Sequence, residues 1–525
     1  MASSSIRSIF ASAVLAAIAS TTVLAAPKTP VVATDDGPVR GTTVGKMQAF
    51  LGVPYAAAPT GDLRWRPPQP HPGWQGVLDT SKFAPHCPQV ATPYGVASTS
   101  EDCLFLNVFT PGKTNSGQPH LLPVMFWIHG GALVVGESDD YDPTPLVTKG
   151  VIVVTINYRL GWLGFLAHPA LSAESAQGAS GNYGLMDQQA AMRWVQRNIR
   201  HFGGDANNVT VFGESAGGLS THSQLVSPLA AGLFHKAIVQ SGAYALTQPS
   251  LAVAQGQGTA FATNTGCASQ SAACLRSLPV STILAAPTPA SIVPNIDGVV
   301  IPQSIGPALS SGQFNRVPVI EGSNHDEWRL FVAQTEKTTG MPLTAAGYIP
   351  AISATLGVSA PVATFIASLY PLGAYPSPSV ALGAIGTDAV FSCNARVAVR
   401  SLSTYVPTFQ YEFNDPNAPM LYFAPPISFP TGAYHASELA YLFNLSLTPV
   451  PPPPFSGPQQ QLSAAMAGYW TQFARTGDPN SAGAPNWPAY RANSDLFESL
   501  RPPTPVASAG FSADHKCAFW TPTSP

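Results

Sequence analysis

Short apolar runs that alternate with helical patterns constrain the fold of this chain more than any other sequence feature. The runs are continuous and rich in β-branched residues, which is typical of strands buried on both faces. They span residues 122–129, 151–158, 209–212, 236–242, 317–324 and 407–413. Between two of them, residues 184–204 carry apolar side chains at helical spacing and end at a Gly-Gly pair. The alternation predicts an α/β fold with a large, mostly parallel central sheet and helices on both faces.

No shift in composition divides the chain into separate domains. Residues 37–56 indicate a small antiparallel beginning, and residues 345–380 are rich in Ala, Pro and Ser without a clear period. The proline stretch 448–455 is typical of a surface loop. Because large α/β enzymes often form one unit of this length, we predict a single domain over residues 27–525.

The N-terminus has the pattern of a secretory signal peptide. A weakly positive start at Arg7 precedes a mostly apolar stretch, and the small residues Ala25 and Ala26 precede Pro27. A membrane-anchoring helix is the alternative, but the apolar run is short and interrupted by Ser and Thr. We therefore predict that residues 1–26 are cleaved, and that the mature protein is secreted (extracellular or periplasmic) without stable membrane insertion.

Charge and cysteine usage agree with an exported protein. The net charge is −3, and the chain has no run of Lys and Arg, so nothing supports nucleic-acid binding. Six cysteines in an exported chain indicate disulfides, although many pairings are possible. Short separations in sequence favour the pairs Cys87–Cys103 and Cys267–Cys274, which leaves Cys393–Cys517 as the third pair. A metal site is the alternative, but no C-x-x-C pair or nearby His at ligand spacing supports it.

The segment Gly213-Glu214-Ser215-Ala216-Gly217 fits the pattern G-x-S-x-G. The pattern alone is weak in a glycine-rich chain. Its context is stronger, because an apolar strand precedes it and a possible helix follows it, as a nucleophile elbow requires. Ser215 is therefore a candidate nucleophile on a tight turn, where the flanking glycines let neighbouring segments approach closely.

Candidate partners for Ser215 follow other predicted strands, at the edge where parallel sheets form their sites. The loop after strand 122–129 contains Gly131 and Ala132, whose backbone N–H groups can stabilise an oxyanion. Carboxylates follow strand 317–324, and His435 comes later, which is the chain order of an α/β-hydrolase. His435 is then the general base, and a carboxylate orients its ring.

Residue patterns alone leave two of these assignments open. His325 is an alternative base, and Asp326 is an alternative to Glu327 as the acid, because all three follow the same strand.

The chain resembles the type-B carboxylesterase family, which includes carboxylesterases, cholinesterases, fungal lipases and para-nitrobenzyl esterases. The resemblance covers about residues 31–520. It rests on the following segments: 50–70, 100–111, 182–218 around the serine, 473–490 and 517–520.

The resemblance implies an α/β-hydrolase fold and a serine carboxylesterase that acts on a small-molecule ester through an acyl-enzyme intermediate, without metal or cofactor. It implies Ser215 as nucleophile, His435 as base and Glu327, rather than Asp326, as acid. It also implies the same three disulfides.

The resemblance assigns supporting roles as well. The backbone amides of Gly131, Ala132 and Ala216 correspond to the oxyanion donors. Glu214 resembles the acid that supports the triad in cholinesterases, and its alternative role is that of a buried, hydrogen-bonded group beneath the turn.

The chain departs from the family pattern at two places. Ala132-Leu133 stands where many members have Gly-Phe, so we expect Leu133 to alter the wall near the acyl site. The segment between Cys87 and Cys103 lacks the tryptophan that holds choline in cholinesterases, so choline specificity is not expected, and Tyr94 is a candidate to line the pocket. We expect the rest of the pocket from the loops 225–300, 340–380 and 415–432.

Two other functions remain as alternatives. A triglyceride lipase of the same family needs an apolar lid, most naturally between Cys87 and Cys103, where this chain is short and mildly polar. A non-catalytic adhesion or binding protein lacks the serine, whereas this chain fills all three triad positions.

Overall fold

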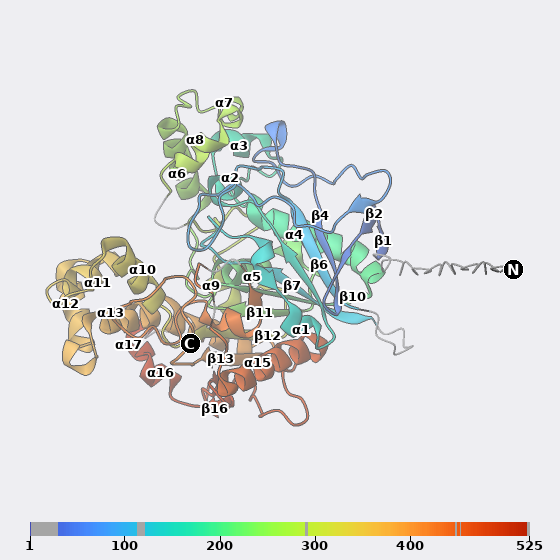
Figure 1. Ribbon diagram of the computed structural model, residues 1–525. Coiled ribbons are helices and arrows are strands. Elements are labelled where there is room, and N and C mark those ends of the chain that lie inside the picture. The colour runs from blue at the N-terminus through green and yellow to red at the C-terminus, as the bar shows by residue number, and fades with distance from the viewer. Residues whose placement is uncertain (2–29, 113–120, 289–291, 447–448, 452, 522–525) are drawn as a thin grey trace.

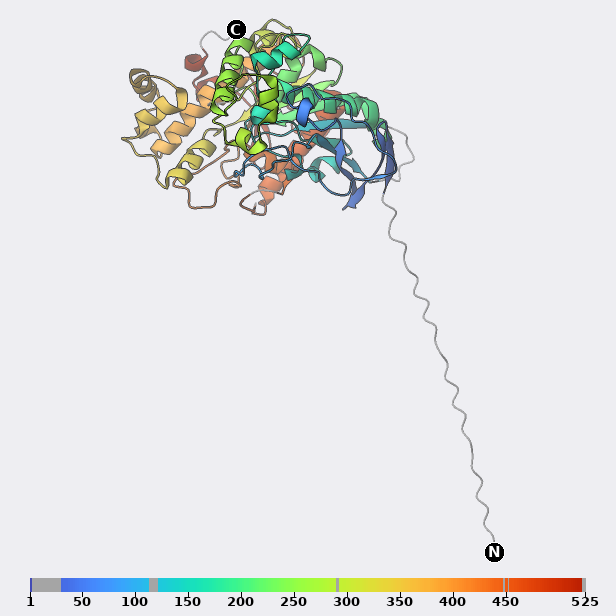
Figure 2. The ribbon, with the colours of Figure 1, turned by 90° about the horizontal axis from the view of Figure 1, so that it is seen from above.

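The computed structural model describes Met1 and residues 30–112, 121–288, 292–446, 449–451 and 453–521. The predicted signal peptide, residues 1–26, therefore lies outside the described residues apart from Met1. Helices flank a central sheet, and the helical group α10–α13, within residues 329–386, lies at the end of the molecule opposite the first strands (Figure 1, Figure 2).

The central sheet has 11 strands within the described residues and is parallel in its middle. Its order is β3 (Thr42–Val44), β4 (Met47–Pro54), β6 (Phe105–Pro111), β9 (Ile152–Ile156), β7 (Leu122–Ile128), β10 (Gly204–Glu214), β11 (Lys236–Gln240), β12 (Val319–Asn324), β13 (Thr408–Phe413), β15 (Phe497–Leu500) and β16 (Val506–Ser508). From β9 through to β15 in this spatial order, each strand pairs in parallel with the next. The strands outside this part, β3, β4 and β6 at one edge and β16 at the other, pair antiparallel. The predicted mostly parallel sheet is confirmed.

Two apolar cores cover the two faces of the sheet. Alternate residues of one strand enter different cores, so that Phe126 of β7 packs in one and Trp127 in the other. The first core includes side chains of α4 (Tyr183–Asn198), α5 (Ala216–Val226), α9 (Ile305–Ser310) and α14 (Cys393–Ser403). The second includes side chains of α1 (Thr144–Val147) and α15 (Gly457–Thr476). The strands read as continuous apolar runs because both faces are buried.

Residues 345–380, which lack a clear period in the sequence, form three short helices. These are α11 (Tyr348–Leu356), α12 (Ala360–Leu369) and α13, which begins at Pro378 and ends at Gly386. Prolines at the start of α12 and α13 interrupt the apolar pattern, yet they suit the first turn of a helix because no backbone N–H is needed there.

The three disulfides are those expected from the sequence: Cys87–Cys103, Cys267–Cys274 and Cys393–Cys517. Among the described helices, none is by itself long and apolar enough to cross a bilayer. One bent pair, α11 with residues 360–374, meets the requirement only by combined length and composition.

A buried ion pair fastens α4 to the loop after β9. The guanidinium of Arg159 donates two hydrogen bonds to the carboxylate of Asp187, at 2.8 and 2.7 Å. A third donor of the same guanidinium bonds to the carbonyl of Arg66 at 2.9 Å. The Arg159 and Asp187 side chains are 3% and 0% exposed, so neither charge can turn to water if its partner is removed.

We expect Asp187→Asn to lower the free energy of unfolding by about 3–5 kcal/mol, because the charge of Arg159 then stays buried without a counter-ion. Urea titration measures the loss. Glu174→Gln is the matched control, since Glu174 makes the same two-point contact with Arg276 at the surface and should cost no more than about 1 kcal/mol. Equal losses in the two variants would contradict the prediction.

Candidate functional site

Ser215 lies on the sharp turn that joins β10 to α5, as the sequence predicts. Its backbone has φ 55° and ψ −118°, a conformation that costs energy for a residue with a side chain. The turn is tight because the neighbouring glycines are packed against backbone. A Cβ on Gly217 would lie 1.9 Å from the carbonyl oxygen of Ile128, and one on Gly213 would lie 2.5 Å from Gly217. The local sequence GESAG therefore satisfies a steric requirement of this turn.

His435 connects Ser215 to Glu327 across the carboxyl edge of the sheet. Its Nε2 lies 2.8 Å from Ser215 Oγ, and its Nδ1 lies 2.6 Å from Glu327 Oε2. The other carboxylate oxygen of Glu327 accepts hydrogen bonds from Ser241 Oγ at 2.5 Å and from the backbone N–H of Asn324 at 2.8 Å. Glu327 is fully buried, so these three hydrogen bonds, rather than solvent, set the position of its carboxylate.

Glu214 is a second carboxylate beside the imidazole. Its Oε1 lies 3.2 Å from Nε2 of His435. Burial raises the pKa of Glu214 well above its usual value, although the charge of His435 opposes that shift. Burial lowers the pKa of His435, but the negative charges of Glu214 and Glu327 outweigh it and raise this pKa to about 9. The site therefore favours a positive charge on His435.

The loop after β7 turns sharply within the same site. Gly131, Ala132 and Leu133 have φ values of 98°, 55° and 61°, a run that exposes successive backbone amides on one side. The amides of Val134 and Val135 both donate to the carbonyl of Gly131, which closes the turn. Gly131 and Ala132 line the same cavity as Ser215.

Ala216 is the first residue of α5, directly after Ser215. The first hydrogen bond at this helix end runs from Leu219 N to Ser215 O at 2.9 Å. The amide of Ala216 precedes that bond, so it belongs to the helix N-terminal N–H groups that have no intrahelical acceptor.

The alternative acid and base lie outside this arrangement. Asp326 accepts the N–H of Ala433 at 3.0 Å and pairs with Arg329 at 2.8 Å. His325 lies between Asp326 and Asp514, at 3.0 and 3.3 Å. Both residues therefore connect surrounding segments instead of contacting Ser215.

A cavity of about 630 Å³ opens on Ser215 and His435. Its walls are mainly aromatic and aliphatic, and none of the described residues that line it is Lys or Arg. The aromatic lining residues are Tyr94, Tyr141, Tyr244, Trp328, Phe331, Phe391 and Tyr422. The carboxylates at its surface are those of Glu137, Asp140 and Glu214. This volume is within the range of about 300–1,000 Å³ that is common for small-molecule sites.

The cavity walls agree only in part with the segments that the sequence indicated. Tyr94 and single residues of two expected loops, Tyr244 and Tyr422, line the cavity, but no residue of 340–380 does. Leu133 also differs from expectation, because it is fully buried in the first apolar core while its neighbours Val134 and Val135 face the cavity. The positive φ at Leu133 turns its side chain inward.

Several wall segments were missed altogether, and two of them lie against His435. Leu330, Phe331 and Gln334 come from α10 (Arg329–Thr339), and Phe391 comes from a π-helical turn, Thr387–Ser392. The rings of Phe331 and Phe391 lie 5.4 and 4.9 Å from the His435 ring, centroid to centroid. The sequence does not indicate that these residues line the cavity, because the same apolar pattern occurs in any helix of the core.

Within the described residues, one group has metal-ligand spacing: His325, Glu412 and Asp514. Each already has a protein partner, since His325 contacts Asp514 and Glu412 contacts His515. The group lies apart from the residues that line the Ser215 cavity.

Comparison with known proteins gives one family and several relatives. A family model described as the carboxylesterase family matches residues 28–520. The chain is 34% identical to fumonisin B1 esterase of Sphingopyxis macrogoltabida, over 86% of this chain and 83% of that protein. It is 34% identical to cocaine esterase of Homo sapiens, over 91% and 88% of the two chains. It is also 34% identical to para-nitrobenzyl esterase of Bacillus subtilis, over 86% and 90%.

We expect Gly217→Ala to lower the free energy of unfolding by at least about 2 kcal/mol, because the added methyl group collides with the backbone of Ile128. Urea titration of the purified protein checks this. Gly256→Ala is the matched control, since Gly256 also lies in a helix, α6 (Leu251–Asn264), with open space around it. The control should be neutral or stabilising by up to about 1 kcal/mol, and a neutral Gly217→Ala would refute the steric argument.

Proposed function

Because this chain belongs to the carboxylesterase family and is a carboxylic ester hydrolase, we propose that it is a secreted serine carboxylesterase with the triad Ser215, His435 and Glu327. One observation is the main support for this triad. His435 lies within hydrogen-bond distance of Ser215 through one ring nitrogen and of Glu327 through the other. This is the arrangement in which a base removes the serine proton while a carboxylate fixes its tautomer.

The proposed reaction has two halves. Ser215 Oγ attacks the ester carbonyl carbon as Nε2 of His435 takes its proton, and the carbonyl oxygen becomes an oxyanion. His435 then gives the proton to the leaving alcohol oxygen as the ester bond breaks, which leaves an acyl group on Ser215. In the second half, a water molecule attacks the acyl carbon as His435 takes one of its protons. His435 returns this proton to Ser215 Oγ as the bond between the acyl carbon and Oγ breaks, which releases the acid product and free Ser215.

The oxyanion of each half needs donors that are already in place. We assign this role to the backbone N–H groups of Gly131, Ala132 and Ala216, since the loop and the helix start meet at Ser215. Such donors stabilise the charge that appears only in the transition state, and each contributes about 3 kcal/mol in well-studied enzymes. Ala132 supplies an N–H as a glycine would.

The substrate we propose is a neutral or weakly charged small-molecule ester. An aromatic and aliphatic cavity of about 630 Å³ suits an apolar acyl or alcohol group. The absence of Lys and Arg from its described lining gives no partner for an anionic substituent. The relatives named for fumonisin B1, cocaine and para-nitrobenzyl esters support only the broader statement that the substrate is a small-molecule ester.

The lipase alternative is less well supported. The segment between Cys87 and Cys103 forms a short hairpin, with bridges between Gln89 and Ser98 and between Thr92 and Gly95. The Gln89 side chain bonds to both the carbonyl and the N–H of Gly136. A segment held in this way is a fixed wall of the cavity rather than an amphipathic lid.

A non-catalytic adhesion role has no observation in its favour, because all three triad positions carry reactive groups in contact. Secretion is proposed on the N-terminal pattern together with three disulfides, which persist in oxidising compartments. N-terminal sequencing of exported protein tests it, and a start at Met1 would contradict cleavage.

We expect Ser215→Ala to reduce kcat for para-nitrophenyl esters by at least about 10⁴-fold, because the nucleophile is absent. The assay uses esters from acetate to palmitate, with the thermal midpoint of each protein as a control for folding. Wild-type rates in the variant would rule out Ser215 as nucleophile. A peak at short acyl chains supports a carboxylesterase, whereas a peak at long chains above the substrate solubility limit would favour the lipase alternative.

We expect Glu214→Gln to move the acid limb of the kcat/KM profile to lower pH by about one unit. The reason is that the Glu214 carboxylate raises the pKa of His435, and only neutral His435 can act as base, so activity falls as pH falls through that pKa. Glu336→Gln is the matched control. Glu336 lies on α10 and accepts a hydrogen bond from Ser428, so its replacement should leave the acid limb in place. An unshifted limb in Glu214→Gln would contradict the assigned contact.

A further inference from the structure

A buried histidine near the C-terminus bridges two carboxylates outside the catalytic cavity. His515 Nδ1 lies 2.7 Å from Asp388 Oδ1, and its Nε2 lies 2.6 Å from Glu412 Oε1. All three side chains are at most 5% exposed. Burial lowers the pKa of His515, but the hydrogen bonds of Asp388 and Glu412 outweigh it and raise this pKa to about 10. The imidazolium therefore neutralises charges that water cannot reach.

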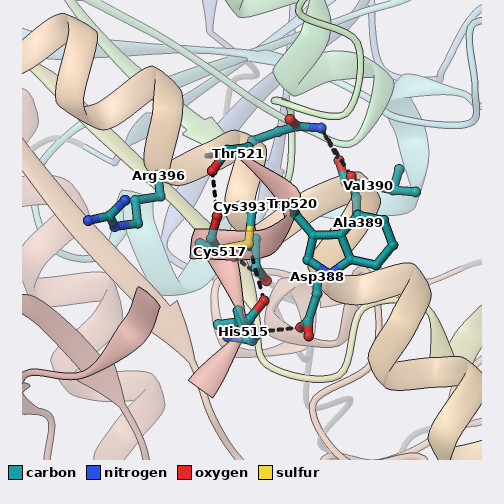
Figure 3. Close-up of a disulfide and its surroundings, with 12 residues drawn as sticks. Asp388, Ala389, Val390, Cys393, Arg396, His515, Cys517, Trp520 and Thr521 are labelled. Carbon is teal, nitrogen blue, oxygen red and sulfur yellow. Dashed lines mark hydrogen bonds and ion pairs between the residues drawn. A yellow bond between two sulfur atoms is a disulfide. The ribbon is translucent and has the colours of Figure 1, made fainter. Parts of the chain in front are cut away.

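The C-terminal segment fastens the π-helical turn Thr387–Ser392 at both of its ends. His515 binds Asp388 near the start of the turn, and Cys517 forms its disulfide with Cys393 directly after the turn (Figure 3). The second oxygen of Asp388 accepts the hydroxyl of Tyr370 at 2.6 Å, and that hydroxyl accepts Trp520 Nε1 at 2.7 Å. A π-helical turn is an uncommon conformation that needs such support and is often found at functional sites.

The same turn carries Phe391 into the active site. Phe391 is 4% exposed, lines the cavity and packs on the ring of His435 at 4.9 Å. It also stacks with Phe331 at 6.2 Å and 9°. Phe391 therefore limits the directions in which the His435 ring can tilt.

On its other side, His515 contacts Glu412, which lies in the strand β13 near Glu327. Glu412 lies in β13, which pairs with β12 in parallel. The N–H of His325, two residues before Glu327, donates to Phe413 of β13 at 3.0 Å. His515 thus joins the support of Phe391 to the support of Glu327, the two groups that flank His435.

We propose that His515 is a positioning residue, which through Asp388 and the π-helical turn holds Phe391 against His435 and so keeps the imidazole aligned for proton transfer. The inference rests on the proposed function of Ser215 and His435. His515 touches neither substrate nor reacting atoms, so its effect passes through the groups that it supports. We assign that effect to Phe391, because Phe391 packs on the His435 ring. A role confined to stability would lower the thermal midpoint without changing catalysis in the folded protein.

The experiment is a double-mutant cycle on kcat and KM for para-nitrophenyl acetate, measured well below the thermal midpoint of each protein. The variants are His515→Gln, Phe391→Leu and the pair of both. We expect His515→Gln to lower kcat about 10-fold with KM within about twofold of wild type. In the Phe391→Leu background the same substitution should lower kcat less than about twofold, because the contact it maintains is already lost.

Tyr370→Phe is the matched control. It removes a hydrogen bond from the same Asp388 carboxylate but leaves the bridge through His515 intact, so kcat should stay within about twofold of wild type while the thermal midpoint falls. Asp388→Asn is measured in parallel. It keeps the size of the side chain and breaks the ion pair, and it should repeat the loss of kcat even if His515→Gln does not fold.

Two results would overturn the inference. One is an equal kcat factor for His515→Gln with and without Phe391→Leu. The other is an unchanged kcat in folded His515→Gln or Asp388→Asn with only the thermal midpoint lowered. Ser215→Ala separates this failure from that of the proposed function, because an inactive wild type, or an active Ser215→Ala, would refute the triad itself.

Discussion

The contact between Gly217 of α5 and the carbonyl of Ile128 in β7 is the constraint on which the site depends. It brings the start of α5 against the end of β7 with no room for a methyl group. The strained backbone of Ser215 is thereby placed next to the loop of Gly131 and Ala132. Ser215, the proposed nucleophile, and the proposed oxyanion donors thus meet because of one backbone contact.

Buried charge gives the site its second property. His435 is surrounded by Glu214 and Glu327, and both carboxylates favour its protonated form. In the proposed mechanism this preference stabilises the imidazolium that forms when Ser215 loses its proton. The same preference means that a higher pH is needed before His435 is neutral and can act as base. Two neighbouring aromatic rings, Phe331 and Phe391, pack against the buried imidazole of His435. A dry surrounding strengthens each of these charge interactions.

Support for the site extends far beyond the sheet edge. The wall at Phe391 rests on a π-helical turn that is held by residues more than 120 positions later, through His515 and the Cys393–Cys517 disulfide. The wall at Phe331 belongs to α10, which begins two residues after Glu327, the proposed triad acid. Catalytic groups and cavity walls therefore share the same anchors, so a substitution at one anchor is expected to alter both.

The sequence by itself determined the elements and the order of the chemistry. Apolar runs indicated the parallel strands, GESAG indicated the turn at Ser215, and the order of Ser215, a carboxylate and His435 indicated a hydrolase. These features depend on neighbours within a few residues, or on a family resemblance spread along the chain. The residue pattern left Glu327 and Asp326 open, the family resemblance favoured Glu327, and the tertiary structure places Glu327 against His435. Only the tertiary structure turns Leu133 inward and places Phe391 beside His435, with His515 behind it. Those outcomes depend on side chains that are remote in sequence and meet only after the strands have paired in one register, so no local pattern records them.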